Sequence, residues 1–262
     1  MTADDLSQIV FGPQRVDSVA NVRRGMSYGE DISLPMDWTC KGFVNRKNGY
    51  AVNGFIFLDK VVKEYLETKD QGLISILKAY VFDWISQNPG FVQGAWAWYD
   101  DAIARRVQRM CYYFSKFGDR FGPDELNAFR RSLDMQARVL MDDSHYAFRH
   151  NHGMFMDFAL MCYALLVCDD QTFREECLDK ACGRMLAYFE YAFAEDGVHK
   201  EHSPGYAREV SNVAATVSSA LASIRPAFAA SAQKYGSGSR SWLAALTMPN
   251  GFLPAIGDSL AC

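Results

Sequence analysis

All five histidines of the chain lie between residues 145 and 202, and four of them fall in two short polar clusters. The first cluster is Arg149-His150-Asn151-His152-Gly153, and the second is His199-Lys200-Glu201-His202-Ser203-Pro204-Gly205-Tyr206. Both precede segments with a helical pattern, so each would lie at a helix N-terminus. Free backbone N–H groups and the helix dipole favour negative charge there. The clusters therefore predict a site for an anionic group.

The first cluster suits carboxylate binding and proton transfer. An Asn, a His and an Arg ahead of an apolar helix are costly to bury without a partner, and a substrate carboxylate would supply one. A place near the helix N-terminus should also bias His152 towards the neutral imidazole, which can accept a proton. The structural alternative is that Asn151 is an N-cap whose side chain is bonded to the backbone.

The second cluster contains a strong helix start and a candidate acid–base residue. Ser203 is the expected N-cap, and Pro204 suits the first helical position. Tyr206 would then lie in the first turn, where the dipole favours phenolate, and Lys200 or Arg208 would favour it further if they point inward. The alternative is a packing tyrosine, one of 13 in the chain.

A metal site would use the same histidines. His150 with His152, and His199 with His202, could supply imidazoles, but no carboxylate or thiol completes a familiar ligand spacing. We therefore expect no metal and no cofactor. The seven cysteines are odd in number and form no CxxC pair, which favours free buried thiols in a reducing compartment.

A glycoside hydrolase would need paired acids, for which Asp100-Asp101 and Asp142-Asp143 are the candidates. Adjacent acids in a helix point to different faces, so helix-end charges are the simpler interpretation. A serine or cysteine nucleophile lacks its local signature.

Three aromatic residues, Trp96, Trp98 and Tyr99, precede a helix that carries Arg105 and Arg106. In one interpretation Trp98 and Tyr99 stack on a sugar while Arg105 binds a uronate. In the other, the aromatics anchor the core, the arginines face solvent, and Arg105 pairs with an aspartate four residues earlier.

The segments that position these residues are helical in pattern. Apolar residues recur at helical spacing over about 52–66, 73–85, 100–117, 123–141, 171–194 and 204–224, with shorter helices to about 247. Residues 152–168 are apolar on nearly every side, which is typical of an inner helix. Residues 1–50 are expected to be a mostly irregular arm with one short helix near 16–24. The segment 236–239 (GSGS) is predicted to be a loop, and no strand pattern is convincing.

This pattern predicts an all-α fold of eight to ten helices joined by short loops. Short connections make neighbours antiparallel, and an inner helix beside amphipathic ones indicates two layers. We expect an (α/α) toroid or incomplete toroid of helical hairpins over residues 51–262. Together with the arm at 1–50 it would make a single domain.

Composition and charge limit the function classes. The 262 residues are 49% hydrophobic and 22% charged, which is typical of a globular chain with a real core. A net charge of -4 disfavours broad nucleic-acid binding. No apolar run is long enough to span a membrane. The acidic N-terminus lacks the apolar region of a secretory signal, so a cytoplasmic location is expected, or a periplasmic or secreted one if the sequence is a piece of a longer protein.

Taken together, the segments resemble the heparinase II/III-like polysaccharide lyases, which include alginate, oligoalginate and heparan-sulfate lyases. The resemblance covers roughly residues 30–260 and implies an (α/α) toroid that acts as a carbon–oxygen lyase, by β-elimination at a uronic acid of an acidic polysaccharide or oligosaccharide. The matching pieces are Asp83-Trp84-Ile85 with Asn88-Pro89, Trp98-Tyr99-Asp100-Asp101-Ala102 with Arg105, Asn151-His152-Gly153, and Glu201-His202-Ser203-Pro204-Gly205-Tyr206.

The resemblance also implies roles for these residues. Asn151 and His152 would bind and neutralise the substrate carboxylate. Tyr206 would protonate the leaving oxygen and in some members also act as the base, with His152 as the competing base. His202 would orient Tyr206 or contact sugar. The expected substrate-binding set is Trp98, Tyr99, Arg105, Arg149, His150 and His202.

Family members continue past a segment like 253–259 into a large β-sandwich, whereas this sequence ends at Cys262. We therefore expect weak or absent activity from this chain alone, and association of copies through the face that the sandwich would cover. Two alternatives stay open: a non-catalytic glycan-binding or assembly module on the same scaffold, and an (α/α) glycoside hydrolase that uses Asp100 or Asp101.

Overall fold

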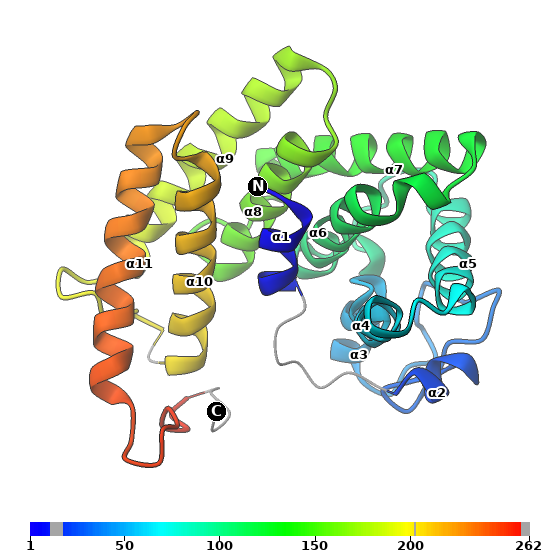
Figure 1. Cartoon of the computed structure of the whole chain (residues 1–262), viewed down its shortest axis with the longest axis horizontal. Coiled ribbons are helices and arrows are strands. Elements are labelled where there is room, and N and C mark those ends of the chain that lie inside the picture. The colour runs from blue at the N-terminus through cyan, green and yellow to red at the C-terminus, as the bar shows by residue number, and fades with distance from the viewer. Residues whose placement is uncertain (11–17, 202, 258–262) are drawn as a thin grey trace.

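The computed structural model describes residues 1–10, 18–201 and 203–257, and these are largely helical (Figure 1). Two short strands, β1 (Met26–Ser27) and β2 (Glu30–Asp31), pair antiparallel. Four 3-10 turns cover Ile56–Leu58, Trp96–Trp98, Gly118–Arg120 and Asp143–His145. The helices are α1 (Ala3–Val10), α2 (Val19–Arg23), α3 (Arg46–Asn53), α4 (Asp59–Thr68), α5 (Gln71–Gln87), α6 (Asp100–Phe117), α7 (Pro123–Met141), α8 (Asn151–Leu166), α9 (Gln171–Ala192), α10 (Pro204–Leu221) and α11 (Pro226–Leu246).

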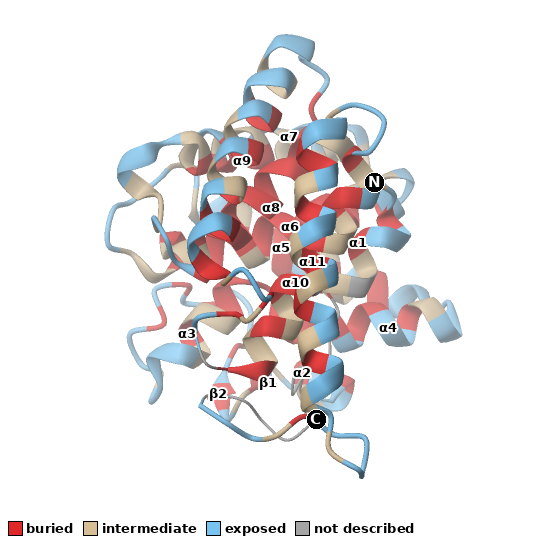
Figure 2. Cartoon of the chain, turned by 90° about the vertical axis from the view of Figure 1, so that its left-hand side faces the viewer, coloured by how far each residue is buried: buried red, intermediate tan, exposed pale blue. Residues whose placement is uncertain are grey.

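Four helical hairpins, α4/α5, α6/α7, α8/α9 and α10/α11, follow one another along the described chain and curve into an incomplete toroid (Figure 1). Helices α6 and α8 pack against each other in the interior, where the buried residues concentrate (Figure 2). Thirteen of the sixteen residues of α8 are buried, as expected for an inner helix. The predicted all-α toroid of helical hairpins is confirmed.

The helices begin where the sequence supplies caps. The side chains of Asp70, Asp170 and Ser203 accept hydrogen bonds from backbone N–H groups in the first turns of α5, α9 and α10. Proline occupies the first position of α7, α10 and α11, where its missing N–H costs nothing. These local signals place each helix start, including the predicted Ser203-Pro204 start of α10.

The first fifty residues hold more regular structure than the sequence predicts. The expected short helix is present as α2, while residues 11–17 lie outside the described part of the chain. Helices α1 and α3 and the two strands were not expected. Helix α1 packs on α6 and α10, and Leu6 is fully buried there. Its apolar face is too short to stand out in the sequence and is stabilised by tertiary packing.

The segment 236–239 is not a loop but the middle of α11. A Cβ on Gly236 would lie 3.3 Å from the side chain of Ala214 on α10, and Ser211 Oγ donates a hydrogen bond to Ser239 Oγ at 2.7 Å. The small side chains let α10 and α11 approach closely. This packing outweighs the poor helix propensity of glycine and serine.

Arg106 and Arg109 of α6 are buried, which corrects the interpretation in which Arg106 faces solvent. The Arg106 guanidinium lies 4.0 Å from the ring centroid of Trp84 and donates to Gln136 Oε1 at 2.8 Å. Arg109 forms an ion pair of 2.7 Å with Asp59, and both side chains are almost fully buried. These contacts fix α6, which carries part of the candidate site at its N-terminus.

The six cysteines in the described residues are free and buried, and Cys262 lies outside that range. No helix in the same part of the chain is long and apolar enough to cross a membrane.

Candidate functional site

The two polar clusters of the sequence meet where the inner helices begin. Asp100, the first residue of α6, lies 3.0 Å from His152, the second residue of α8. Asn151, the first residue of α8, donates through Nδ2 to Glu201 Oε2 at 3.3 Å, shortly before α10 begins. The N-termini of α6, α8 and α10 therefore gather at one place. The positive ends of the three helix dipoles favour anions there.

Helix α8 is capped by His150 rather than by Asn151. His150 Nδ1 accepts a hydrogen bond from the backbone N–H of His152 at 3.1 Å. The Asn151 side chain is therefore not bonded to the backbone as an N-cap, although the residue is only 5% exposed. Its Oδ1 is buried and has no hydrogen-bond partner among the described residues. The Asn151 amide is therefore held at the start of α8, and its Oδ1 can still accept a hydrogen bond.

His152 is held by a carboxylate, and this alters the protonation that the sequence suggested. Burial acts to lower the pKa of His152, but the hydrogen bond and charge of Asp100, together with the charge of Asp101, raise it above the ordinary value. The expected bias towards the neutral ring is therefore wrong. Burial also acts to raise the pKa of Asp100, and the hydrogen bond and charge of His152 outweigh it, so this pKa lies below its ordinary value. The pair is an ion pair whenever His152 is protonated.

A cavity of about 430 Å3 opens beside this pair, and its lining includes Arg46, Tyr99 and Tyr146 together with the Asp100 carboxylate. The rings of Tyr50 and Tyr99 are stacked with centroids 4.0 Å apart. The Arg46 guanidinium lies over both rings, at 5.1 Å and 5.5 Å from their centroids. This wall offers an aromatic surface and a cation.

Sequence reasoning found Tyr99 but missed Arg46 and Tyr50. Both come from α3, which lies in the segment expected to be an irregular arm. No motif marks them, because their place in the cavity depends on how α3 packs against α6.

Trp98 also lines this cavity, but most of its ring is covered by the core. It is 1% exposed, and its ring packs against Trp84 and Phe91 at centroid distances of 5.7 Å and 5.6 Å. Trp98 therefore anchors the core at the edge of the cavity, beside Tyr99, and its expected contact with sugar stays a prediction.

Arg105 is engaged within the protein. Its Nε lies 3.1 Å from Asp101 Oδ1, the predicted pairing at a spacing of four residues. Its guanidinium also lies 4.0 Å from the ring centroid of Phe155, and Nη2 lies 3.9 Å from Glu209 on α10. Arg105 therefore links the starts of α6, α8 and α10, and its expected contact with substrate stays a prediction.

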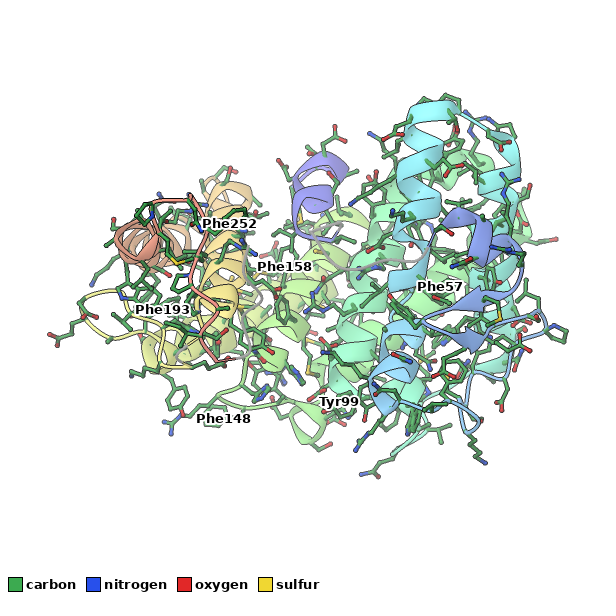
Figure 3. All side chains as sticks on the ribbon, turned by 90° about the horizontal axis from the view of Figure 1, so that it is seen from below. Phe57, Tyr99, Phe148, Phe158, Phe193 and Phe252 are labelled. Atoms are coloured by element: carbon green, nitrogen blue, oxygen red, sulfur yellow. The ribbon has the colours of Figure 1, made fainter. Side chains whose placement is uncertain are left out.

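Arg149 lies on the rim of the site. Its guanidinium is 5.1 Å from the ring centroids of both Phe148 and Tyr191. Phe148 projects outward from the same edge of the molecule as Tyr99 (Figure 3).

Tyr206 is half-buried in the first turn of α10, where its backbone N–H donates to Ser203 Oγ at 3.3 Å. His202 lies outside the described residues, so its role remains a prediction.

His199 belongs to the core rather than to the site. It is fully buried, its Nε2 lies 3.1 Å from the hydroxyl of Tyr188, and burial lowers its pKa to about 4. Among the described residues no group of three His, Cys, Asp or Glu side chains is arranged to hold a metal ion. His199 therefore lies in the core, whereas His150 and His152 lie at the start of α8.

The second acidic doublet also has a structural role. Asp142 accepts a hydrogen bond from the backbone N–H of Ser144 at 2.8 Å, and Asp143 pairs with Lys180 and Arg184 on α9. These are helix-end charges, as the simpler interpretation expected.

Comparisons with known proteins show the family and the fold of the chain. The sequence matches the family described as Heparinase II/III N-terminus over residues 18–262. A heparan sulfate lyase from Pedobacter heparinus has a similar fold, with a TM-score of 0.68 and 16% identity over 96% of this chain and 44% of that chain. No curated protein matches the sequence.

Two structures described as heparinase III are also similar in fold. One has a TM-score of 0.70 and 14% identity over 100% of this chain and 44% of that chain. The other has a TM-score of 0.67 and 17% identity over 95% of this chain and 38% of that chain. The chain thus spans less than half the length of the solved structures it matches. Because the sequence match extends over most of its residues, the chain belongs to the Heparinase II/III N-terminus family.

Proposed function

We propose that this chain is the toroid part of a polysaccharide lyase that cleaves an acidic glycan by β-elimination at a uronic acid. The observation that carries the proposal is the His152–Asp100 pair beside the buried Asn151 amide, at the meeting point of three helix N-termini. The solved structures of similar fold are named heparan sulfate lyase or heparinase III, which supports an acidic polysaccharide as the substrate class.

The reaction removes the proton on C5 of the uronate, which is acidified by the neighbouring carboxylate. The electron pair left on C5 forms a C4=C5 double bond, the C4–O glycosidic bond breaks, and the leaving oxygen takes up a proton. Negative charge develops on the carboxylate in the transition state, so hydrogen-bond donors aimed at it accelerate the step. Asn151 Nδ2 is such a donor. It now contacts the Glu201 carboxylate, the same kind of group that it would hold in a substrate.

His152 is suited to take the C5 proton. Asp100 engages its Nδ1, which leaves Nε2 as the nitrogen that can accept a proton. Because Asp100 raises the pKa of His152, the neutral ring is a stronger base than it would be without the carboxylate. Tyr206 supplies the proton to the leaving oxygen from the first turn of α10. Tyr206 follows Glu201 by five residues in the chain, and the contact of Glu201 with Asn151 supports a position of Tyr206 near that side of the site.

The wall of the cavity positions the sugar. The stacked rings of Tyr50 and Tyr99 offer an apolar surface beside Asp100, and Arg46 supplies a positive charge for an acidic group. Arg149, which is exposed and immediately precedes His150 in the chain, supplies a second positive charge. The site therefore combines sugar-binding surface, carboxylate recognition and proton transfer.

The test is an assay for the unsaturated product. The purified chain is incubated with alginate, heparan sulfate, hyaluronan and polyglucuronate, and near-UV absorbance reports the new double bond. Tyr206→Phe and His152→Gln should each lower turnover about 100-fold or more while keeping glycan binding. Tyr235→Phe is the matched control, because Tyr235 packs against Phe189 and Phe193, away from the site.

Undiminished turnover in both site variants would contradict the assigned roles. A flat trace with every polymer would show that this chain alone does not catalyse the elimination, and glycan binding by the same scaffold would then be the property to test. Product with saturated ends would instead indicate a hydrolase.

A further inference from the structure

A second cavity, of about 540 Å3, lies outside the candidate site, on the face of α7 towards the loop that follows α5. We call it the α7 cavity. Its lining includes Phe91 from the loop, Arg131, Asp134 and Arg138 from α7, and His145 from the turn after it.

The cations of this cavity are available for a ligand. Arg131 and Arg138 are exposed and lie seven residues apart on α7, about 10.5 Å along one face of the helix. Neither guanidinium has an ion pair or a side-chain hydrogen bond among the described residues, and Arg138 only lies over the ring of Phe173, 4.6 Å from its centroid. Each fork of N–H donors can therefore hold a separate carboxylate or sulfate.

The acids that line the cavity are engaged elsewhere. Asp134 Oδ1 accepts a hydrogen bond of 2.6 Å from the hydroxyl of Tyr163. Asp142 Oδ1 accepts from the backbone N–H of Ser144 at 2.8 Å. Neither carboxylate lies within ion-pair distance of Arg131 or Arg138, so the two arginines are not neutralised at close range.

An aromatic ring stands opposite the arginines. Phe91 is 42% exposed, yet its position is fixed by edge contacts with Trp98 and with His145, at centroid distances of 5.6 Å and 5.2 Å. A fixed ring with an open face can pack against the C–H face of a pyranose. His145 also lines the cavity and holds this ring through the contact with Phe91.

His145 connects this cavity to the candidate site, because it lines both the α7 cavity and the cavity beside Tyr99. We propose that the α7 cavity is a distal subsite for an acidic oligosaccharide, in which Arg131 and Arg138 bind acidic groups of a segment remote from the bond at His152. For the identity of the glycan the inference rests on the proposed function.

The test compares the binding of short and long ligands to the whole chain. Calorimetric titration with a heparan sulfate disaccharide and a dodecasaccharide is carried out on the wild type and on the double variant Arg131→Ala/Arg138→Ala. The double variant should bind the dodecasaccharide about tenfold or more weakly and the disaccharide unchanged, because only the long ligand reaches both cavities. Arg130→Ala is the control for lost charge, since Arg130 lies on the same helix but pairs with Asp169.

Equal affinity of the wild type and the double variant for the dodecasaccharide would overturn the proposal. So would an equal loss in Arg130→Ala, or no binding of the dodecasaccharide by the wild type. The readout is affinity rather than turnover. A chain that forms no unsaturated product but loses dodecasaccharide binding in the double variant would show that this chain alone does not catalyse the elimination and would support the subsite.

Discussion

Asp100 Oδ1 lies 3.0 Å from His152 Nδ1, and this contact joins the first turn of α6 to the first turn of α8. Both residues lie where helix dipoles favour negative charge, which would disfavour a protonated imidazole. The Asp100 carboxylate reverses that preference: it is itself stabilised at the start of α6, and it holds the proton on the ring. The pair therefore provides a basic group in a place that otherwise favours anions.

The first prediction concerns this pair. In an NMR titration, the pKa of His152 should lie above its ordinary value, and Asp100→Asn should lower it, because the carboxylate that offsets burial is removed. The pair should stabilise the fold below the pKa of the unfolded histidine, and this contribution should be lost as pH rises through the folded-state pKa. Asp119→Asn, on an exposed turn, is the control. An unchanged His152 pKa in Asp100→Asn would contradict the assignment.

The second prediction concerns the glycine that follows His152. A Cβ at Gly153 would lie 2.2 Å from the carbonyl oxygen of Ala147 and 2.9 Å from Tyr146, so Gly153→Ala must displace backbone beside the site. We expect it to lower the free energy of unfolding by about 2 kcal/mol or more in chemical denaturation.

The control for Gly153 is Gly183, inside α9, where a Cβ meets nothing within 4 Å. Gly183→Ala should raise the free energy of unfolding by about 0.5–1 kcal/mol, because alanine has the better helix propensity. A neutral Gly153→Ala would show that the segment before α8 can move without cost.

The third prediction concerns His199, whose pKa burial lowers to about 4. An unfolded histidine titrates near 6.5, so between these values the unfolded state binds the additional proton. Stability should therefore fall as pH drops from about 6.5 to 4, by about 3 kcal/mol if this residue acts alone. Denaturation at several pH values measures it. His199→Gln keeps a polar partner for Tyr188 but cannot titrate, so its loss of stability in this window should be smaller by that amount. An identical pH dependence in both proteins would show that His199 is not the cause.

Much of the architecture could be predicted because helix signals are local. The apolar periodicity of α5 to α10 and the Ser203-Pro204 start of α10 act within one or two turns. Helix α1 and the middle of α11 could not be predicted in this way. Leu6 is buried only because α1 meets α6 and α10, and Gly236 is helical because α10 needs space beside it.

In the candidate site, too, some features could be predicted from the sequence and others depend on tertiary packing. The sequence by itself predicted polar clusters at the starts of helices, because helix caps and turns are determined by residues that are close together in the chain. Only the tertiary structure decided that Tyr99 faces a cavity while Trp98 is buried, that Arg46 and Tyr50 join from α3, and that His152 meets Asp100. The physical reason is that burial and ion pairing depend on how hairpins distant in the chain pack together. A pattern confined to one helix does not contain that information.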